Sequence, residues 1–310
     1  MLSRRFFVLS LPVALFLLNG CAHDRPEVHG LKQIGIGAAQ YQQESAARFP
    51  ADDLGRPVAL KQPAKRVVAI GPGLVETMFT LGAKGQLVGR DDYADFPLPA
   101  KQVAIAGDFN GPNIEQCLAL RPDLVIVQGE TSNRAKFDDW QSKLGVPVAA
   151  LTTTNFKDLA RDFRKVGAWI GQKARAGALA KHFQSPSAPL KHAAKALIET
   201  GDSPGFIAGR GTLVSEAARH AGYGNIADEL GIDLYKQVNV EALLVHPPDL
   251  VIVPSKKSKA QVLATLRADG ALASLPCVRA GHVVVVNGDW LLRPGPRLLD
   301  GVAALRTAKG

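Results

Sequence analysis

The sequence predicts an α/β protein with two similarly built lobes, each around a parallel central sheet. The segment NIEQCLALRPDLVIV at 113–127 recurs as NVEALLVHPPDLVIV at 239–253, with nine of fifteen positions identical. Helical segments also alternate with short unbroken apolar runs, which is typical of strands buried on both faces. With 310 residues, 46% of them hydrophobic, the chain is long enough for two domains. We therefore expect two lobes with a ligand cleft between them.

Each copy of the repeat predicts one helix followed by one buried strand. Asn113 and Asn239 are expected to cap the helices, and Pro122 and Pro248 to end them. The apolar run that follows is too short for a membrane span and too continuous for a half-exposed strand. Chance recurrence of a common strand phrase is the alternative. The shared cap, glutamate, Pro-Asp turn and strand argue against it.

The N-terminus has the order of a secretory signal. Arg4 and Arg5 precede an apolar run at 6–18, which is short for a stable transmembrane helix. Residues 18–21, LNGC, resemble the lipobox of bacterial lipoproteins, whose cysteine is acylated and becomes the new N-terminus. Asn19 is less usual at its position, so export without lipidation is the alternative. We expect a signal peptide at 1–20, a periplasmic protein anchored to a bacterial membrane through Cys21, and a tether at 21–48.

Charge and cysteine usage exclude some partners. The formal net charge is +9, and it is +7 without Arg4 and Arg5. No dense basic run with interleaved aromatic residues occurs, so we expect no nucleic-acid binding. Cys117 and Cys277 lie in different halves, and the distance expected between the lobes argues against one bridge, so we expect two buried free thiols.

The first lobe is expected over 49–154. A hairpin with its turn at 53–55 leads into a strand at 66–70. The βα alternation of a parallel sheet follows. Its elements are a helix at 74–81, a strand at 87–89, a loop at 90–97, the first repeat copy and a strand at 146–151.

A helical segment at 155–192 is expected to connect the lobes. Apolar residues at 156, 159, 163, 166 and 170 share one helix face, and Gly171 ends this helix. A second helix is expected at 172–184. Pro186 and Pro189 then interrupt it, because proline lacks an N–H donor and clashes with the preceding turn.

The second lobe, 193–310, repeats the alternation. Its expected elements are a strand at 196–199, a helix at 213–221, the second repeat copy, a helix at 260–266, a strand at 282–286 and a helix from Arg297.

Aromatic and charged side chains follow the predicted strands in both halves. Ligands of open parallel sheets bind beyond the carboxyl ends of the strands. Each of these residues alone is explained equally well as a loop anchor, turn former or cap. Together they predict a site for a flat or bulky ligand. The expected ligand-binding residues are Tyr93, Asp95, Phe109, Phe206, Asp289, Trp290 and Arg293.

Glu115 and Glu241 stand two residues after the capping asparagines. A carboxylate there gains about 0.3–1 kcal/mol from the helix dipole, which explains either residue alone. However, a helix that leads into a parallel strand begins at the carboxyl edge of the sheet. We therefore expect both glutamates at the cleft rim, one per lobe, docking on a partner with two basic sockets.

From residue 49 to the C-terminus, these features together resemble the substrate-binding proteins of ABC importers. The resemblance is to class III, whose two Rossmann-like lobes are joined by one connecting helix. Residues 52–82 are similar to the opening of its ferric-siderophore, haem and cobalamin binders. The resemblance implies a monomeric protein that is no enzyme, has no cofactor, and delivers a metal chelate to a membrane permease.

Within this class, the site segments are most similar to those of cobalamin binders. The segments 93–97 (YADFP) and 289–293 (DWLLR) match ligand-contacting segments there, and Phe109 and Phe206 match further aromatic contacts. Glu115 and Glu241 fall on glutamates that engage transporter arginines.

The chain departs from the family at two positions. Asp108 stands where haem binders carry an iron-ligating tyrosine, and Phe109 where the cobalamin binder has a larger indole. We expect a cobalamin-like corrinoid first, a ferric siderophore next and haem last.

Other classes of function fit less well. Gly71-Pro72-Gly73 with Asp91 imitates a dinucleotide fingerprint, but Glu76 would face the pyrophosphate. A metal-ion site is not expected, because the candidates His220, His246 and His282 lie on predicted elements or directly before a proline. No GxSxG, CxxC or HExxH motif occurs. A purely structural lipoprotein would have no use for the aromatic loops.

Overall fold

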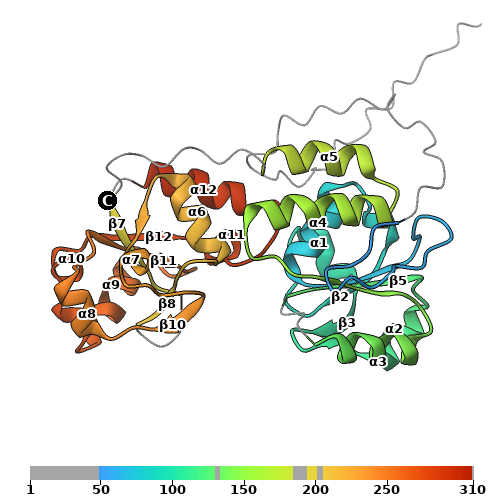
Figure 1. The fold of residues 1–310 in the computed structure, drawn as a ribbon, viewed down its shortest axis with the longest axis horizontal. Coiled ribbons are helices and arrows are strands. Elements are labelled where there is room, and N and C mark those ends of the chain that lie inside the picture. Colours follow the sequence, from blue (N-terminus) through green and yellow to red (C-terminus); the bar gives the residue numbers. More distant parts are fainter. Residues whose placement is uncertain (1–48, 130–132, 184–193, 201–204, 309–310) are drawn as a thin grey trace, which may run out of the picture.

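Two lobes, each with its own parallel sheet, lie side by side in the computed structural model (Figure 1). The model describes residues 49–129, 133–183, 194–200 and 205–308. The expected signal peptide, Cys21, the tether, Pro186 and Pro189 lie outside these ranges. No helix of the described ranges is long and apolar enough to cross a bilayer.

The first lobe is built on a six-stranded sheet in the order β4-β3-β2-β1-β5-β6, parallel except for β4. Helices α1 and α4 cover one face and α2 and α3 the other, so the central strands are buried (Figure 1). The strands are β1 (Val67–Ile70), β2 (Leu87–Asp91), β3 (Ala104–Asp108), β4 (Gly111–Pro112), β5 (Leu124–Gln128) and β6 (Val148–Leu151). The helices are α1 (Pro72–Thr80), α2 (Ile114–Leu120) and α3 (Arg134–Leu144), followed by α4 (Phe156–Trp169) and α5 (Lys173–Lys181).

The second lobe combines a parallel sheet, β12-β11-β7-β9, with an antiparallel pair, β10-β8. Its strands are β7 (Lys195–Ile198), β8 (Phe206–Ala208), β9 (Gly224–Asn225), β10 (Tyr235–Gln237), β11 (Leu250–Pro254) and β12 (Val283–Val286). Its helices are α6 (Leu213–Ala221), α7 (Ile226–Glu229), α8 (Val240–Val245), α9 (Lys259–Ala268), α10 (Pro276–Ala280), α11 (Gly288–Leu291) and α12 (Leu298–Thr307).

The two repeat copies have the expected construction. The Asn113 side chain accepts a hydrogen bond from the Gln116 N–H at 3.1 Å, and Asn239 accepts from the Glu241 N–H at 3.0 Å. Each copy continues into a strand, β5 or β11, with parallel neighbours on both sides. Helix α2 ends at Arg121, in the left-handed conformation, so Pro122 follows the end instead of causing it.

The hairpin expected over 49–70 is wrong, because no strand precedes β1 in the described residues. Two carboxylates explain the difference, since they engage backbone N–H groups beside β6. Asp52 accepts from the Ala150 N–H at 3.2 Å, and Asp53 from the Thr152 N–H at 2.7 Å. The segment therefore covers the edge of the sheet without pairing as a strand.

Three segments that carry expected site residues contain regular structure. Residues 107–111 belong to the β3–β4 hairpin, Phe206 is the first residue of strand β8, and residues 288–291 form helix α11. Helix α3 has no counterpart among the expected elements.

The connecting segment consists of two helices, α4 and α5, separated at Gly171, whose φ is 75°. The start of α4 packs on the second lobe. The Phe156 N–H donates to Glu216 of α6 at 2.6 Å, and the Phe156 ring stacks on His220 with centroids 4.2 Å apart. The largest apolar cluster contains residues of both lobes, and each lobe also has a smaller cluster of its own.

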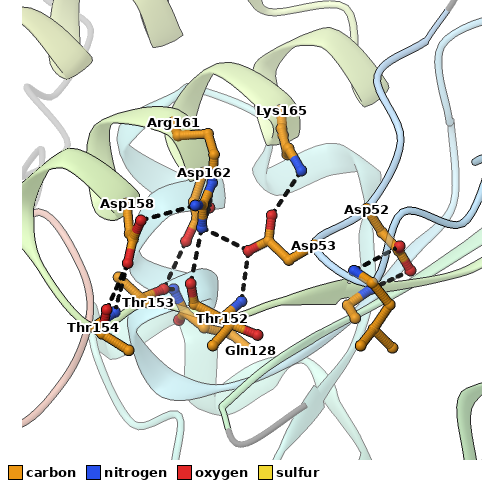
Figure 2. A network of polar contacts seen from close by, with 12 residues as sticks. Asp52, Asp53, Gln128, Thr152, Thr153, Thr154, Asp158, Arg161, Asp162 and Lys165 are labelled. Atoms are coloured by element: carbon orange, nitrogen blue, oxygen red, sulfur yellow. Dashed lines mark hydrogen bonds and ion pairs between the residues drawn. The ribbon is translucent and has the colours of Figure 1, made fainter. Parts of the chain in front are cut away.

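A polar network, which we call the α4 clasp, holds residue 53 against α4 (Figure 2). Asp53 accepts from Arg161 at 2.7 Å and from Lys165 at 2.6 Å. Arg161 also contacts Asp158 and Asp162. The clasp thus joins the beginning of the described chain to the connecting helix.

Candidate functional site

Tyr93 lies at the carboxyl edge of the first sheet, close to its topological switch between β1 and β5. The Asp91 carboxylate accepts hydrogen bonds from the Gly71 N–H at 2.8 Å and the Tyr93 N–H at 2.9 Å. It therefore joins the loops that follow β1 and β2. Burial is the main cause that raises the pKa of Asp91, and these hydrogen bonds oppose it. The Tyr93 side chain is left 61% exposed.

Phe109 lies at the tip of the hairpin between β3 and β4, where Asp108 pairs with Gly111. Asp108 accepts from the Asn110 N–H at 2.7 Å, which fixes the turn. Phe109 is 83% exposed, so folding gains little from its ring. An open hollow of about 540 Å³ beside the turn has Asp92, Lys136 and Trp140 in its lining.

Phe206 follows β7 in the second lobe and stacks on Tyr235 of β10, with centroids 6.3 Å apart and planes at 12°. Both rings are partly exposed, Tyr235 at 46%. Tyr235 could not be predicted as a neighbour of Phe206 from the sequence, because its surroundings have no strand periodicity and its pairing opposite Ala208 of β8 joins distant residues. An aromatic residue in an irregular stretch was the only signal.

Asp95, Asp289 and Arg293 form one charged cluster between the lobes. Arg293 contacts Asp95 of the first lobe at 2.7 Å and Asp289 of its own lobe at 3.1 Å. Burial tends to raise the pKa of Asp95, but the hydrogen bond and charge of Arg293 outweigh it and lower the pKa. Lys256 also pairs with Asp289, at 2.8 Å. Three expected ligand-binding residues thus come together from distant positions.

A buried ion pair lies next to this cluster. Arg297 binds both carboxylate oxygens of Glu76, and its guanidinium carbon lies 3.8 Å from the centroid of the Phe96 ring. Burial raises the pKa of Glu76, while Arg297 and Arg293 oppose that rise. Close by, a Cβ at Gly73 would lie 2.2 Å from the Pro294 carbonyl oxygen, so the lobes meet backbone to backbone.

Trp290 and the two docking candidates have contrasting environments. Trp290, on α11, is half-buried and packs against the main core, which agrees with its alternative role as an anchor. Glu115 and Glu241 are both exposed in the first turn of their helices, α2 and α8.

The geometry argues against the dinucleotide alternative. Asp91 is occupied by backbone N–H groups, and Glu76 by Arg297. Pro294 also covers the first turn of α1, where a pyrophosphate would have to approach.

The described ranges contain neither a metal-ion site nor a reactive thiol. These residues contain no group of three or more His, Cys, Asp or Glu side chains that could hold a metal ion. His220 is buried and stacked on Phe156, whereas His246 and His282 are exposed. Cys117 and Cys277 are free and buried, as expected. Burial raises the pKa of both thiols, that of Cys117 to about 11, so neither is a reactive thiolate.

Comparison with known proteins gives the family. Residues 67–289 match the model described as periplasmic binding protein. The chain belongs to this family. It is therefore a periplasmic binding protein and not an enzyme, and the two-lobed α/β architecture expected from the sequence is confirmed.

Individual relatives are distant but are covered over most of their length. The chain is 25% identical over 243 residues to the vitamin B12-binding protein of Pectobacterium carotovorum, covering 76% of this chain and 84% of the relative. It is 29% identical to a periplasmic haem-binding protein of Pseudomonas aeruginosa, with a TM-score of 0.67 and 79% and 92% covered. The periplasmic vitamin B12-binding protein of Vibrio cholerae, 24% identical with a TM-score of 0.63, shares the fold.

Proposed function

We propose that this protein captures a cobalamin-like corrinoid and delivers it to the permease of an ABC importer. The observation that carries the proposal is a set of exposed aromatic rings, two at the carboxyl edge of the first sheet and two on the β8–β10 pair of the second lobe. Aromatic rings that stay exposed in the folded protein can cover the faces and edges of a large ligand. The set consists of Tyr93, Phe109, Phe206 and Tyr235.

The charged cluster supplies the polar half of the proposed site. Asp95 and Asp289 offer acceptors and Arg293 offers donors, which together suit the amide groups at the periphery of a corrinoid. Trp290 flanks this cluster on α11. Because the three charges already pair with one another, ligand binding replaces existing contacts.

Haem, which the sequence placed last, gains support from the match to a periplasmic haem-binding protein. The residue at position 108 argues against it, because the Asp108 carboxylate is engaged in its own turn. A ferric siderophore stays an alternative of the same class.

Calorimetry on a soluble form that starts after Cys21 tests the choice of ligand. Cyanocobalamin, haemin and a panel of ferric siderophores are titrated separately. We expect heat of binding with cyanocobalamin. No heat with any of them would refute the chelate proposal, and heat with haemin alone would show that the argument from Asp108 is wrong.

We also propose that Cys21 is lipidated and anchors the protein to a bacterial membrane. Labelling of cells with a palmitate analogue is expected to mark the wild type and not Cys21→Ser. A label on both proteins would contradict the anchor.

Docking on the permease is proposed to use Glu115 and Glu241. Reversal of both charges, E115K with E241K, is expected to abolish uptake and leave ligand affinity unchanged, because both carboxylates are exposed on the outer helices. Unchanged uptake would return both residues to the role of helix-dipole partners.

A further inference from the structure

Leu118 and Leu244 are a second matched pair of exposed side chains on the repeat helices. They occupy the same position of the two repeat copies, and each is 49% exposed. Burial of a leucine is favourable, so an apolar side chain left half in water at both positions adds little to folding. The recurrence of an exposed leucine at both positions indicates a function on the surface.

The pattern of identity within the repeat supports this interpretation. In the helical part, the two copies agree at the capping asparagine, the glutamate and this leucine. The buried position between them differs, with Cys117 in one copy and Leu243 in the other. The two helices thus agree at two exposed positions and differ at a core position, which is the reverse of what packing alone requires.

Each leucine follows its glutamate by three residues. Side chains three apart lie side by side on a helix, so each lobe presents an acidic group next to an apolar one. Helices α2 and α8 lie toward opposite ends of the molecule and on the same side of it in the view of Figure 1. The two helices are therefore widely spaced, and one partner that spans both lobes could contact both of them.

We propose that Glu115 with Leu118, and Glu241 with Leu244, form two equivalent docking faces for a partner that presents one surface twice. On that surface, a basic group lies beside an apolar socket. Two copies of one face in a single chain fit a partner with two-fold symmetry. The exposed carboxylates of Glu115 and Glu241 select a basic surface on the partner. The inference rests on the proposed function, and the partner is the permease.

Uptake by cells that lack the native gene tests the leucines. The variant L118N with L244N removes apolar surface without adding charge, so Glu115 and Glu241 keep their surroundings. We expect uptake of cyanocobalamin to fall about tenfold or more, as is usual when apolar anchors of an interface are lost. Affinity for cyanocobalamin is expected to stay unchanged. The matched control is L98N, at a leucine that is 74% exposed outside the repeat, and it is expected to support full uptake.

Cross-linking provides a readout that needs no ligand. A photoreactive phenylalanine analogue is placed at 118, 244 or 98 in the full chain in its own host. Products with a permease subunit are expected from 118 and 244 and not from 98. No product from 118 or 244, or wild-type uptake by the double variant, would overturn the inference. If the wild type binds no chelate, the proposed function fails instead, and the cross-links still decide the docking faces.

Discussion

At the scale of one residue, Phe109 indicates a function because its exposed ring contributes little to the stability of the fold. Its ring is 83% exposed at the tip of a hairpin whose conformation depends on Asp108 and Gly111. Neither the turn nor the sheet needs the ring. We therefore propose that a ligand covers it.

We predict that Phe109→Ala weakens binding of cyanocobalamin about 10- to 100-fold, because an aromatic anchor at a binding site is typically worth 2 kcal/mol or more. The free energy of unfolding is expected to change by less than about 0.5 kcal/mol, as for other exposed side chains. Fluorescence titration and urea unfolding measure the two quantities. Leu98→Ala, at another exposed apolar residue, serves as the control. Equal affinities of wild type and Phe109→Ala would remove this ring from the site.

At the scale of elements, the α4 clasp shows why the first residues of the lobe do not form a strand. The Asp53 carboxylate accepts hydrogen bonds from Thr152, Arg161 and Lys165 (Figure 2). Asp162 accepts a hydrogen bond from the Thr153 hydroxyl at 2.6 Å. Strand propensity was a poor guide here, because the partners lie about a hundred residues away and are known only from the fold.

The clasp leads to a prediction for pH. Burial is the main cause that raises the pKa of Asp162 to about 7, and Arg161 opposes it. The folded protein therefore binds a proton between about pH 4 and 7 that the unfolded chain releases, so this group lowers stability as pH rises through that window. Asn at this position cannot ionise. We expect the stability of Asp162→Asn relative to wild type to increase by about 2 kcal/mol from pH 5 to pH 8.

Thermal or urea unfolding at several pH values measures this difference. A constant difference between variant and wild type across pH 5–8 would show that Asp162 is ionised throughout. Asp139→Asn, at an exposed carboxylate paired with Lys143, is the control and is expected to show no such trend.

At the scale of the whole molecule, the buried pair of Glu76 and Arg297 links the two lobes, in addition to their shared apolar cluster. Glu76 and Arg297 are separated by 221 positions and join α1 to the segment before α12. Arg293 connects the pair to the charged cluster, because it lies 3.7 Å from Glu76 and 2.7 Å from Asp95.

We predict that Glu76→Gln destabilises the protein by about 3–5 kcal/mol, because it leaves the Arg297 charge buried without its partner. The double variant E76L with R297M is expected to lie closer to wild type than Glu76→Gln does. Urea unfolding measures both. Asp233→Asn breaks an exposed ion pair with Arg210, whose side chains are 66% and 46% exposed, and is expected to change stability by less than about 1 kcal/mol. Similar losses of unfolding free energy from Glu76→Gln and Asp233→Asn would show that the buried pair contributes no more to stability than the exposed one.

Local patterns in the sequence were enough to determine the α/β class, the two repeat units with their caps, and the break between α4 and α5. These features depend on neighbours within a few residues, which the sequence displays. Arg293, Asp95 and the other expected site residues were predicted from strand-end positions and from resemblance. That Arg293 binds Asp95, that Tyr235 stacks on Phe206, and that Leu118 and Leu244 are equally exposed were decided only by the tertiary structure. Each of these depends on the packing of residues far apart in the chain, and no local pattern encodes it.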